Sequence, residues 1–132
     1  MNLFRLGDFT LHSGVRSRFK IDCDALTDDD WQALAFLASQ HLPVFSHVCG
    51  IPRGGDRFAA ALAKYAVSGA DDLPILIVDD VLTTGGSMRR ERDRSLTFRA
   101  GCGVIGCVVF ARGSCPDWVT PLFAIAPSKE GS

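Results

Sequence analysis

Two adjacent acids and a segment of hydroxyl and glycine residues lie close together in the middle of the chain. Asp79 and Asp80 directly follow the apolar run Ile75–Val78, and the polar segment after them contains Thr83, Thr84, Gly85, Gly86 and Ser87. Two like charges side by side cost free energy unless a cation or several donors compensate them, and sugar hydroxyls or a sugar-bound magnesium ion would do so. Glycines let a backbone approach a ligand closely, and free N–H groups at a helix start form an anion site. The pattern therefore predicts a site for a phosphorylated ribose.

Other arrangements also place acids after an apolar strand. The simplest is a surface loop followed by a capped helix, and Ser87 is a suitable N-cap with or without a ligand. P-loop nucleotidases need an upstream GxxxxGK[ST] motif, and this chain has none. Receiver domains also cluster aspartates, but they do not need the hydroxyl- and glycine-rich segment. The simple surface loop stays open as the alternative.

A second glycine-rich segment, Gly50–Gly55, lies between an apolar run and a helical pattern. Arg53 supplies a permanent cation, and Gly54 and Gly55 leave backbone amides accessible to a ligand. A tight turn with a solvated arginine is the alternative interpretation of this loop.

The elements that would position these loops alternate between strand and helix. We expect strands at Val44–Cys49, Ile75–Val78 and Val104–Ala111, an edge strand at Trp118–Ile125, and helices from Phe58 to near Gly69 and from Ser87 to about Arg99. This order predicts an α/β fold with a parallel sheet and helices on both of its faces. Ligands bind such sheets at the carboxyl ends of the strands, where both glycine-rich loops would lie.

The N-terminal part differs from this core. Phe4–Asp24 alternates apolar and polar residues in places and predicts short strands joined by a turn at Ser13-Gly14. A helix follows, with Thr27 as its N-cap and Asp30 at the capping-box position. The length of 132 residues suits one domain. We expect residues 1–24 to form a small β segment and residues 25–126 the α/β core.

The segment Pro74–Met88, which reads PILIVDDVLTTGGSM, resembles the phosphoribosyl pyrophosphate signature of the type I phosphoribosyltransferases. That signature is an apolar strand, two acids, two or three further residues, and Thr-Thr-Gly. The resemblance spans Phe9 to about Ala111. It implies that phosphoribose is transferred from phosphoribosyl pyrophosphate to a small nitrogenous base, with Mg2+ as cofactor and release of pyrophosphate, in nucleotide synthesis or salvage.

The resemblance also implies a role for each loop. Asp79 and Asp80 would hold the ribose diol and magnesium, the latter through water and ligand, and Arg53 would complete the catalytic set. The remaining substrate-binding positions are Pro52, Gly54, Gly55, Val81, Leu82, Thr83, Thr84, Gly85, Gly86 and Ser87. Within that set, Thr83–Ser87 would hold the 5-phosphate, and Gly54 and Gly55 would join Arg53 in holding the pyrophosphate.

The segment Phe9–Asp24 resembles the hood of the orotate phosphoribosyltransferases, which covers the nucleobase. By position, the residues near the base would be His12, Ser13, Phe19 and Lys20. The family usually has lysine at the position of His12, so the sequence leaves the base open, and an ordinary strand histidine is the alternative.

One departure from the family bears on activity. Members carry a further strand and a long mobile loop before the acidic strand, but here only Ser68–Leu73 fills that interval. Whether the chain is an enzyme is therefore uncertain, and we favour a transferase. The alternative is a non-catalytic module that senses phosphoribosyl pyrophosphate or a nucleotide.

Composition narrows the other possibilities. The formal charge of −1 gives no reason to expect a nucleic acid or an anionic membrane as partner. The five cysteines are irregularly spaced without a CxxC pair, which favours buried thiols in a reducing compartment. We expect a cytoplasmic protein and, by analogy with the family, a homodimer. The arginines of Met88–Arg99 form a solvated face by this interpretation, with phosphate or dimer contacts by Arg89 or Arg90 left open.

Overall fold

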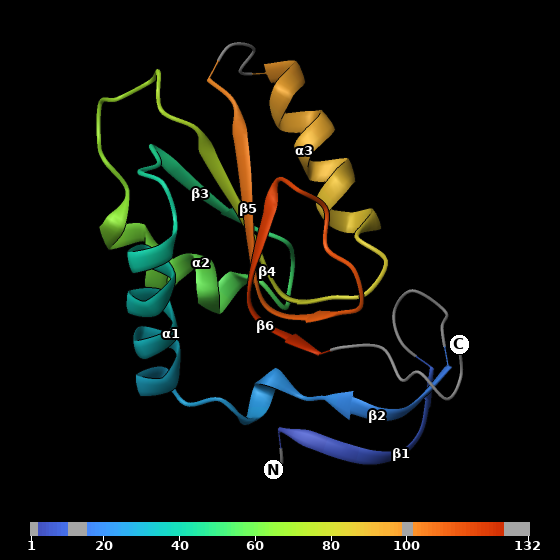
Figure 1. Ribbon diagram of the computed structural model, residues 1–132. Coiled ribbons are helices and arrows are strands. Elements are labelled where there is room, and N and C mark those ends of the chain that lie inside the picture. Colours follow the sequence, from blue (N-terminus) through green and yellow to red (C-terminus); the bar gives the residue numbers. More distant parts are fainter. Residues whose placement is uncertain (1–2, 11–15, 99–101, 126–132) are drawn as a thin grey trace.

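Four parallel strands form the centre of the molecule (Figure 1). The computed structural model describes residues 3–10, 16–98 and 102–125. The strands lie in the order β3, β4, β5 and β6, with bounds His47–Gly50, Ile75–Leu82, Val104–Arg112 and Val119–Ile125. This arrangement confirms the predicted α/β fold and the predicted edge strand. Strands β5 and β6 are joined by residues 113–118, a parallel crossover without a helix.

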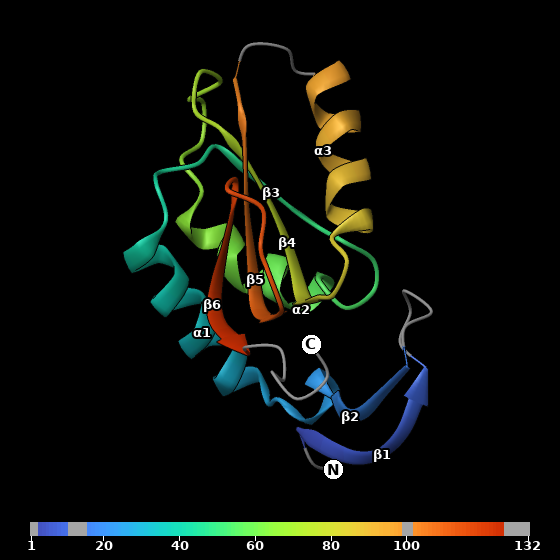
Figure 2. The ribbon, with the colours of Figure 1, turned by 45° about the vertical axis from the view of Figure 1, so that its right-hand side comes forward.

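Helices cover both faces of this sheet, as predicted (Figures 1 and 2). Helices α1 (Asp28–His41) and α2 (Asp56–Leu62) lie on one face, and α3 (Gly86–Phe98) lies on the other. Alternate residues of β4 bury into the two layers: Leu76 belongs to the core on the α1 and α2 side, and Ile77 to the core that includes Met88 of α3. Because both faces are covered, the strand reads as a continuous apolar run.

Helix α1 begins where its local sequence signals place it. The Thr27 hydroxyl accepts from the N–H of Asp30, and the Asp30 carboxylate accepts from the N–H of Thr27, which forms the predicted capping box. Trp31 follows and is buried against Phe58 of α2, with the two ring centroids 5.8 Å apart. Arg57 donates to the Asp28 carboxylate at 2.7 Å and so ties the start of α2 to the start of α1.

Strand β4 is longer than predicted, and the acids lie within it. The predicted strand ended at Val78 and a loop began at Asp79, but the ladder with β5 continues through Asp79, Val81 and Leu82. The prediction was wrong because the charges were taken as the end of the strand. A neighbouring strand satisfies the backbone regardless of side-chain charge.

Other predicted boundaries shift as well. Strand β3 begins at His47 rather than Val44, and α2 ends at Leu62, followed by the 3-10 turn η2 (Ala63–Tyr65). Helix α3 begins at Gly86, and the N–H of Arg89 donates to the Gly85 carbonyl. Gly85 therefore occupies the cap position that was predicted for Ser87.

The N-terminal residues form a hairpin that lies beyond the carboxyl ends of the core strands (Figures 1 and 2). Strands β1 (Phe4–Thr10) and β2 (Arg16–Ile21) pair antiparallel and lead through the 3-10 turn η1 (Cys23–Ala25) into α1. The hairpin is anchored by the ring of Phe4, whose centroid lies 6.0 Å from that of Phe110 at the end of β5. The predicted turn at Ser13-Gly14 lies outside the described residues. No helix in the described parts of the chain is long and apolar enough to span a membrane.

Candidate functional site

The two acids lie side by side near the end of β4, and both are half-buried. The N–H of Asp80 donates to Asp79 Oδ1 at 2.8 Å, and the N–H of Val81 donates to Asp80 Oδ1 at 2.7 Å. Burial raises the pKa of Asp79 to about 8, and the hydrogen bond to the Asp80 side chain and its charge act in the same direction. The pair is thus poised to accept a cation or hydroxyl donors, which would favour the ionised form.

The arginine loop, residues 51–55, packs directly on this acid pair. The N–H of Ile51 donates to the Val78 carbonyl at 2.9 Å, which fixes the start of the loop against β4. A β-carbon on Gly54 would lie 2.5 and 2.6 Å from the two Asp80 carboxylate oxygens, so any side chain there would force the carboxylate or the loop to move. The Pro52–Arg53 peptide bond is cis, and Arg53 is exposed. The loop that carries this permanent cation therefore packs against the Asp80 carboxylate through Gly54.

The segment after β4 presents backbone amides at the start of α3. Gly85 has a φ of +81°, a conformation that favours glycine. The buried side chains of Leu82 and Met88 hold the segment from both ends. The N–H groups of residues 84–88 donate to no backbone carbonyl of the described chain, and Thr84 and Ser87 are exposed. This end of α3 therefore retains the free donors that an anion requires.

All three segments meet at one edge of the sheet. Strands β3 and β4 are parallel neighbours, so the arginine loop and the acids lie at the same end. Cys23, which follows the hairpin, is also near: burial raises the pKa of its thiol to about 12, with the charge of Asp80 as the next cause. The edge thus combines carboxylates, a cation and free amides beneath an N-terminal hairpin.

Comparison with known proteins places this arrangement in a family. No family model matches the chain. The orotate phosphoribosyltransferase of Pyrobaculum calidifontis is 30% identical over 131 residues, which cover 80% of this chain and 67% of that protein. The chain belongs to the type I phosphoribosyltransferase family.

Solved structures agree on the fold of this chain. The crystal structure of orotate phosphoribosyltransferase from Aeropyrum pernix is similar with a TM-score of 0.73 and 24% identity, covering 92% of this chain and 88% of that one. A phosphoribosyltransferase from Corynebacterium diphtheriae is similar with a TM-score of 0.64 and 17% identity, covering 83% and 84% of the two chains. The relatives that carry these names are transferases, so the comparisons do not favour a non-catalytic sensor.

The predicted base-proximal residues are only partly described. Lys20 is exposed on β2, and Phe19 lies on the same strand opposite Leu6, with its side chain outside the description. His12 and Ser13 lie outside the described residues. Their predicted proximity to a base stays a prediction.

Two predicted substrate-binding residues of β4 have side chains that pack into the protein core and not toward the predicted ligand site. Leu82 is buried in the core on the α3 side, and Val81 packs against the core on the α1 side. Any ligand contact there would use the backbone. Conversely, sequence reasoning passed over Arg112, which lies half-buried at the carboxyl end of β5, because it placed the end of that strand at Ala111. Burial lowers the pKa of this arginine.

The short connection Ser68–Leu73 lies at the opposite edge of the sheet from the acids (Figure 1). It directly precedes β4, and it is held there by the N–H of Val67, which donates to the Phe45 carbonyl at 2.9 Å. The Ser46 hydroxyl donates to the Leu73 carbonyl at 3.1 Å. This connection therefore does not reach over the predicted ligand site.

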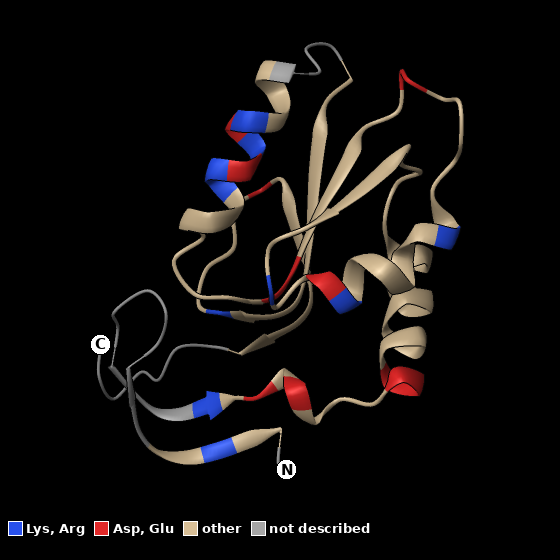
Figure 3. Cartoon of the chain, turned by 180° about the vertical axis from the view of Figure 1, so that it is seen from behind, with Lys and Arg blue, Asp and Glu red and all other residues tan. Residues whose placement is uncertain are grey.

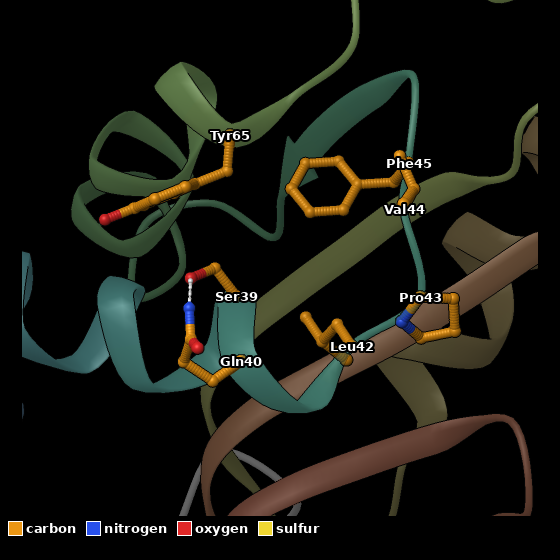
Figure 4. A pocket seen from close by; sticks show the side chains of 7 residues that line it. All are labelled: Ser39, Gln40, Leu42, Pro43, Val44, Phe45 and Tyr65. Atoms are coloured by element: carbon orange, nitrogen blue, oxygen red, sulfur yellow. Dashed lines mark hydrogen bonds between the residues drawn. The ribbon is translucent and has the colours of Figure 1, made fainter.

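Two hollows are separate from the acid pair. The first, about 230 Å³, lies where α1 ends and the chain turns toward β3 (Figure 4), and its lining consists of Ser39, Gln40, Leu42, Pro43, Val44, Phe45 and Tyr65. The second, about 480 Å³, lies between the hairpin, α1 and the ends of β5 and β6, and its lining consists of Leu3, Phe4, Leu26, Asp30, Ala33, Leu34, Phe110 and Phe123. Neither is lined by the acids, the arginine loop or the start of α3.

The acid pair suits magnesium when ligand oxygens complete the coordination. Mg2+ prefers oxygen donors, and proteins commonly hold it with one or two carboxylates plus water and substrate phosphates. Nowhere in the described chain do three His, Cys, Asp or Glu side chains gather into a metal site. Asp79 and Asp80 fit the shared type of site, in which the protein supplies only part of the coordination shell.

Proposed function

We propose that this phosphoribosyltransferase binds phosphoribosyl pyrophosphate at the end of β4 and transfers its phosphoribose to a nitrogenous base, releasing pyrophosphate. The observation that carries the proposal is the packing of Gly54 on the Asp80 carboxylate. It joins a cationic loop to the acid pair within van der Waals contact. A pyrophosphate and the ribose that bears it need those two groups side by side.

Each segment takes one part of the substrate in this proposal. The hydroxyls of Thr83, Thr84 and Ser87 and the free amides of residues 84–87 bind the 5-phosphate, and Asp79 and Asp80 accept hydrogen bonds from the ribose hydroxyls. Arg53 and the amides of Gly54 and Gly55 bind the pyrophosphate. Magnesium, when bound with the substrate, neutralises charge on the leaving pyrophosphate. Val81 and Leu82 offer backbone contacts only, because their side chains pack into the core.

The chemistry follows from where these charges lie. As the bond to pyrophosphate lengthens, positive charge develops at the anomeric carbon, and the nearby carboxylates stabilise it. Arg53 stabilises the negative charge that develops on the departing group. Positioning and electrostatics therefore supply the acceleration, and no covalent nucleophile is needed.

The acceptor base would lie between the sheet edge and the hairpin. The hairpin is anchored at Phe4 and Phe110, so β1 and β2 lie beyond the strand ends, which supports the proposed role of a hood. His12, Ser13, Phe19 and Lys20 remain the proposed base-proximal residues. We further propose that residues 1–24 and the core act as one domain in a cytoplasmic homodimer.

The decisive experiment measures pyrophosphate release from phosphoribosyl pyrophosphate with magnesium and a panel of bases that includes orotate. The test variant is Asp79→Asn with Asp80→Asn. The matched control is Asp71→Asn with Asp72→Asn, because that exposed acid pair lies in the connection at the far edge of the sheet. We expect the wild type to release pyrophosphate, and the rate of release to fall by at least about 100-fold in the test variant and to stay unchanged in the control. The reason is that charge contacts shielded from solvent are worth several kcal/mol. Ligand binding without release for any base would contradict the proposed transfer.

A further inference from the structure

The side chain of Arg90 folds back over the start of its own helix. Its Nη1 atom lies 3.4 Å from the position that a β-carbon on Gly86 would occupy, and its Nη2 donates to the Ser87 hydroxyl at 3.2 Å. Helical side chains tilt toward the N-terminus, so a residue covers the turn that precedes it. Because Gly86 has no side chain, the guanidinium can lie close to the backbone there.

The side chain of Arg89 also folds back toward the start of the helix, over Gly85. Its Nη2 atom lies 3.9 Å from the position that a β-carbon on Gly85 would occupy. Two guanidinium groups therefore lie against the two glycines that expose the free amides. Both arginines are exposed.

This clustering of positive charge is opposite to what a helix start favours. The N-terminus of a helix carries a partial positive charge, and acids rather than cations stabilise it. The first turn of α3 contains no acidic residue. Within the described residues neither Arg89 nor Arg90 has a carboxylate within salt-bridge distance, whereas Arg94 of the same helix pairs with Glu91 at 4.0 Å. The start of α3 thus lacks a compensating anion (Figure 3 shows acids only further along the helix).

We propose that Arg90 is a specificity-determining residue that binds the 5-phosphate directly, with Arg89 as a second cation beside it. This inference rests on the proposed function, and it adds side-chain charge to a subsite otherwise made of amides and hydroxyls. The planar guanidinium offers two parallel N–H donors to two phosphate oxygens. The protein then selects a dianionic phosphorylated sugar over an unphosphorylated one through Arg90.

The test is calorimetric titration of the full chain with ribose 5-phosphate and, separately, with magnesium pyrophosphate. We compare the wild type with Arg90→Gln, Arg90→Lys and the control Arg94→Gln, which removes the same charge about one turn further along the helix. Arg90→Gln should weaken ribose 5-phosphate binding by about 10- to 100-fold, the range of a charge-assisted hydrogen bond. The affinity of Arg90→Lys for ribose 5-phosphate should lie between those of the wild type and Arg90→Gln, because lysine keeps the charge and loses the pair of parallel N–H donors. The affinity for magnesium pyrophosphate should change by less than about twofold in every variant, since the proposed pyrophosphate-binding residues lie on the arginine loop.

The outcomes separate this inference from the proposed function. Unchanged ribose 5-phosphate affinity in Arg90→Gln overturns the role of Arg90 while the transferase proposal stands. Equal losses for both ligands, or an equal loss in Arg94→Gln, reduce the effect to general electrostatics and also overturn it. A wild type that binds neither ribose 5-phosphate nor magnesium pyrophosphate overturns the proposed function itself.

Discussion

Gly54→Ala tests the junction between the arginine loop and the acid pair. The added methyl group would lie 2.5 Å from Asp80 Oδ1, 2.6 Å from Oδ2 and 2.7 Å from Cγ. Ordinary contacts of a β-carbon begin at about 3.4 Å, so the carboxylate or the loop must move by nearly 1 Å. Gly54 does not have a positive φ, so alanine is acceptable to the backbone. The whole effect should therefore be steric.

Overpacking of this kind costs about 1–3 kcal/mol, and we expect that loss in the free energy of unfolding. Asp80→Ala removes the three clashing atoms, so Gly54→Ala should cost less than about 0.5 kcal/mol in that background. Asp80→Asn keeps the shape and removes the charge, so the full penalty should persist there. Urea unfolding followed by fluorescence of the two tryptophans, Trp31 and Trp118, measures all six proteins of these cycles.

Two results would refute this reasoning. If Gly54→Ala is equally costly beside Asp80→Ala, the loop is strained for another reason and the contact is not the cause. If the penalty disappears beside Asp80→Asn, charge rather than shape governs the junction. Binding of phosphoribosyl pyrophosphate with magnesium should weaken in Gly54→Ala, because the displaced carboxylate no longer faces the ribose.

Three further predictions concern titration, thiols and capping. Because burial raises the pKa of Asp79 to about 8, the folded ligand-free protein binds more protons than the unfolded chain at intermediate pH. The stability that Asp79 contributes is therefore present below about pH 4 and is lost as pH rises through about 8. The free energy of unfolding of the wild type should fall more between about pH 5 and about pH 8.5 than that of Asp79→Asn, and equal losses would exclude this titration. Cys23 and Cys107 are buried and their thiol pKa values are raised to about 12, so an aromatic disulfide reagent at mildly alkaline pH should label them only in denaturant, as peptide mass analysis would reveal. Thr27→Ala should destabilise the protein by about 1 kcal/mol through loss of the capping box, whereas Thr97→Ala, at the far end of α3, should change urea stability by less than half as much.

The parts of the fold that the sequence predicted correctly depend on residues close together in the chain. The start of α1 follows from Thr27 and Asp30 alone, because a capping box is a contact between residues three apart. The parallel sheet followed from the alternation of apolar runs and helical patterns. The position of the acids within β4 did not follow, because it depends on pairing with Val108 and Phe110 of another strand.

In the candidate site, too, the residue types could be predicted from the sequence, but the contacts between distant segments could not. Asp79, Asp80, Arg53 and the glycines were predicted from their types and spacing. The contact between Gly54 and Asp80 joins the arginine loop to strand β4, two segments far apart in the chain, and no spacing rule predicts it. The sequence left a phosphate contact by Arg89 or Arg90 open, but it did not show that the Arg90 guanidinium folds back over Gly86 and Ser87, because that orientation is a property of the folded helix.

The extension of β4 through the acids has a consequence for binding thermodynamics. Carboxylates on a mobile loop lose freedom when they capture a ligand, and that loss subtracts from the affinity. Here the peptide groups around Asp79 are already immobilised by the ladder with β5 before any sugar arrives. Ligand capture at this edge should therefore show a small ordering entropy for the backbone, and affinity should depend on the rotamers of two short side chains rather than on folding of a segment.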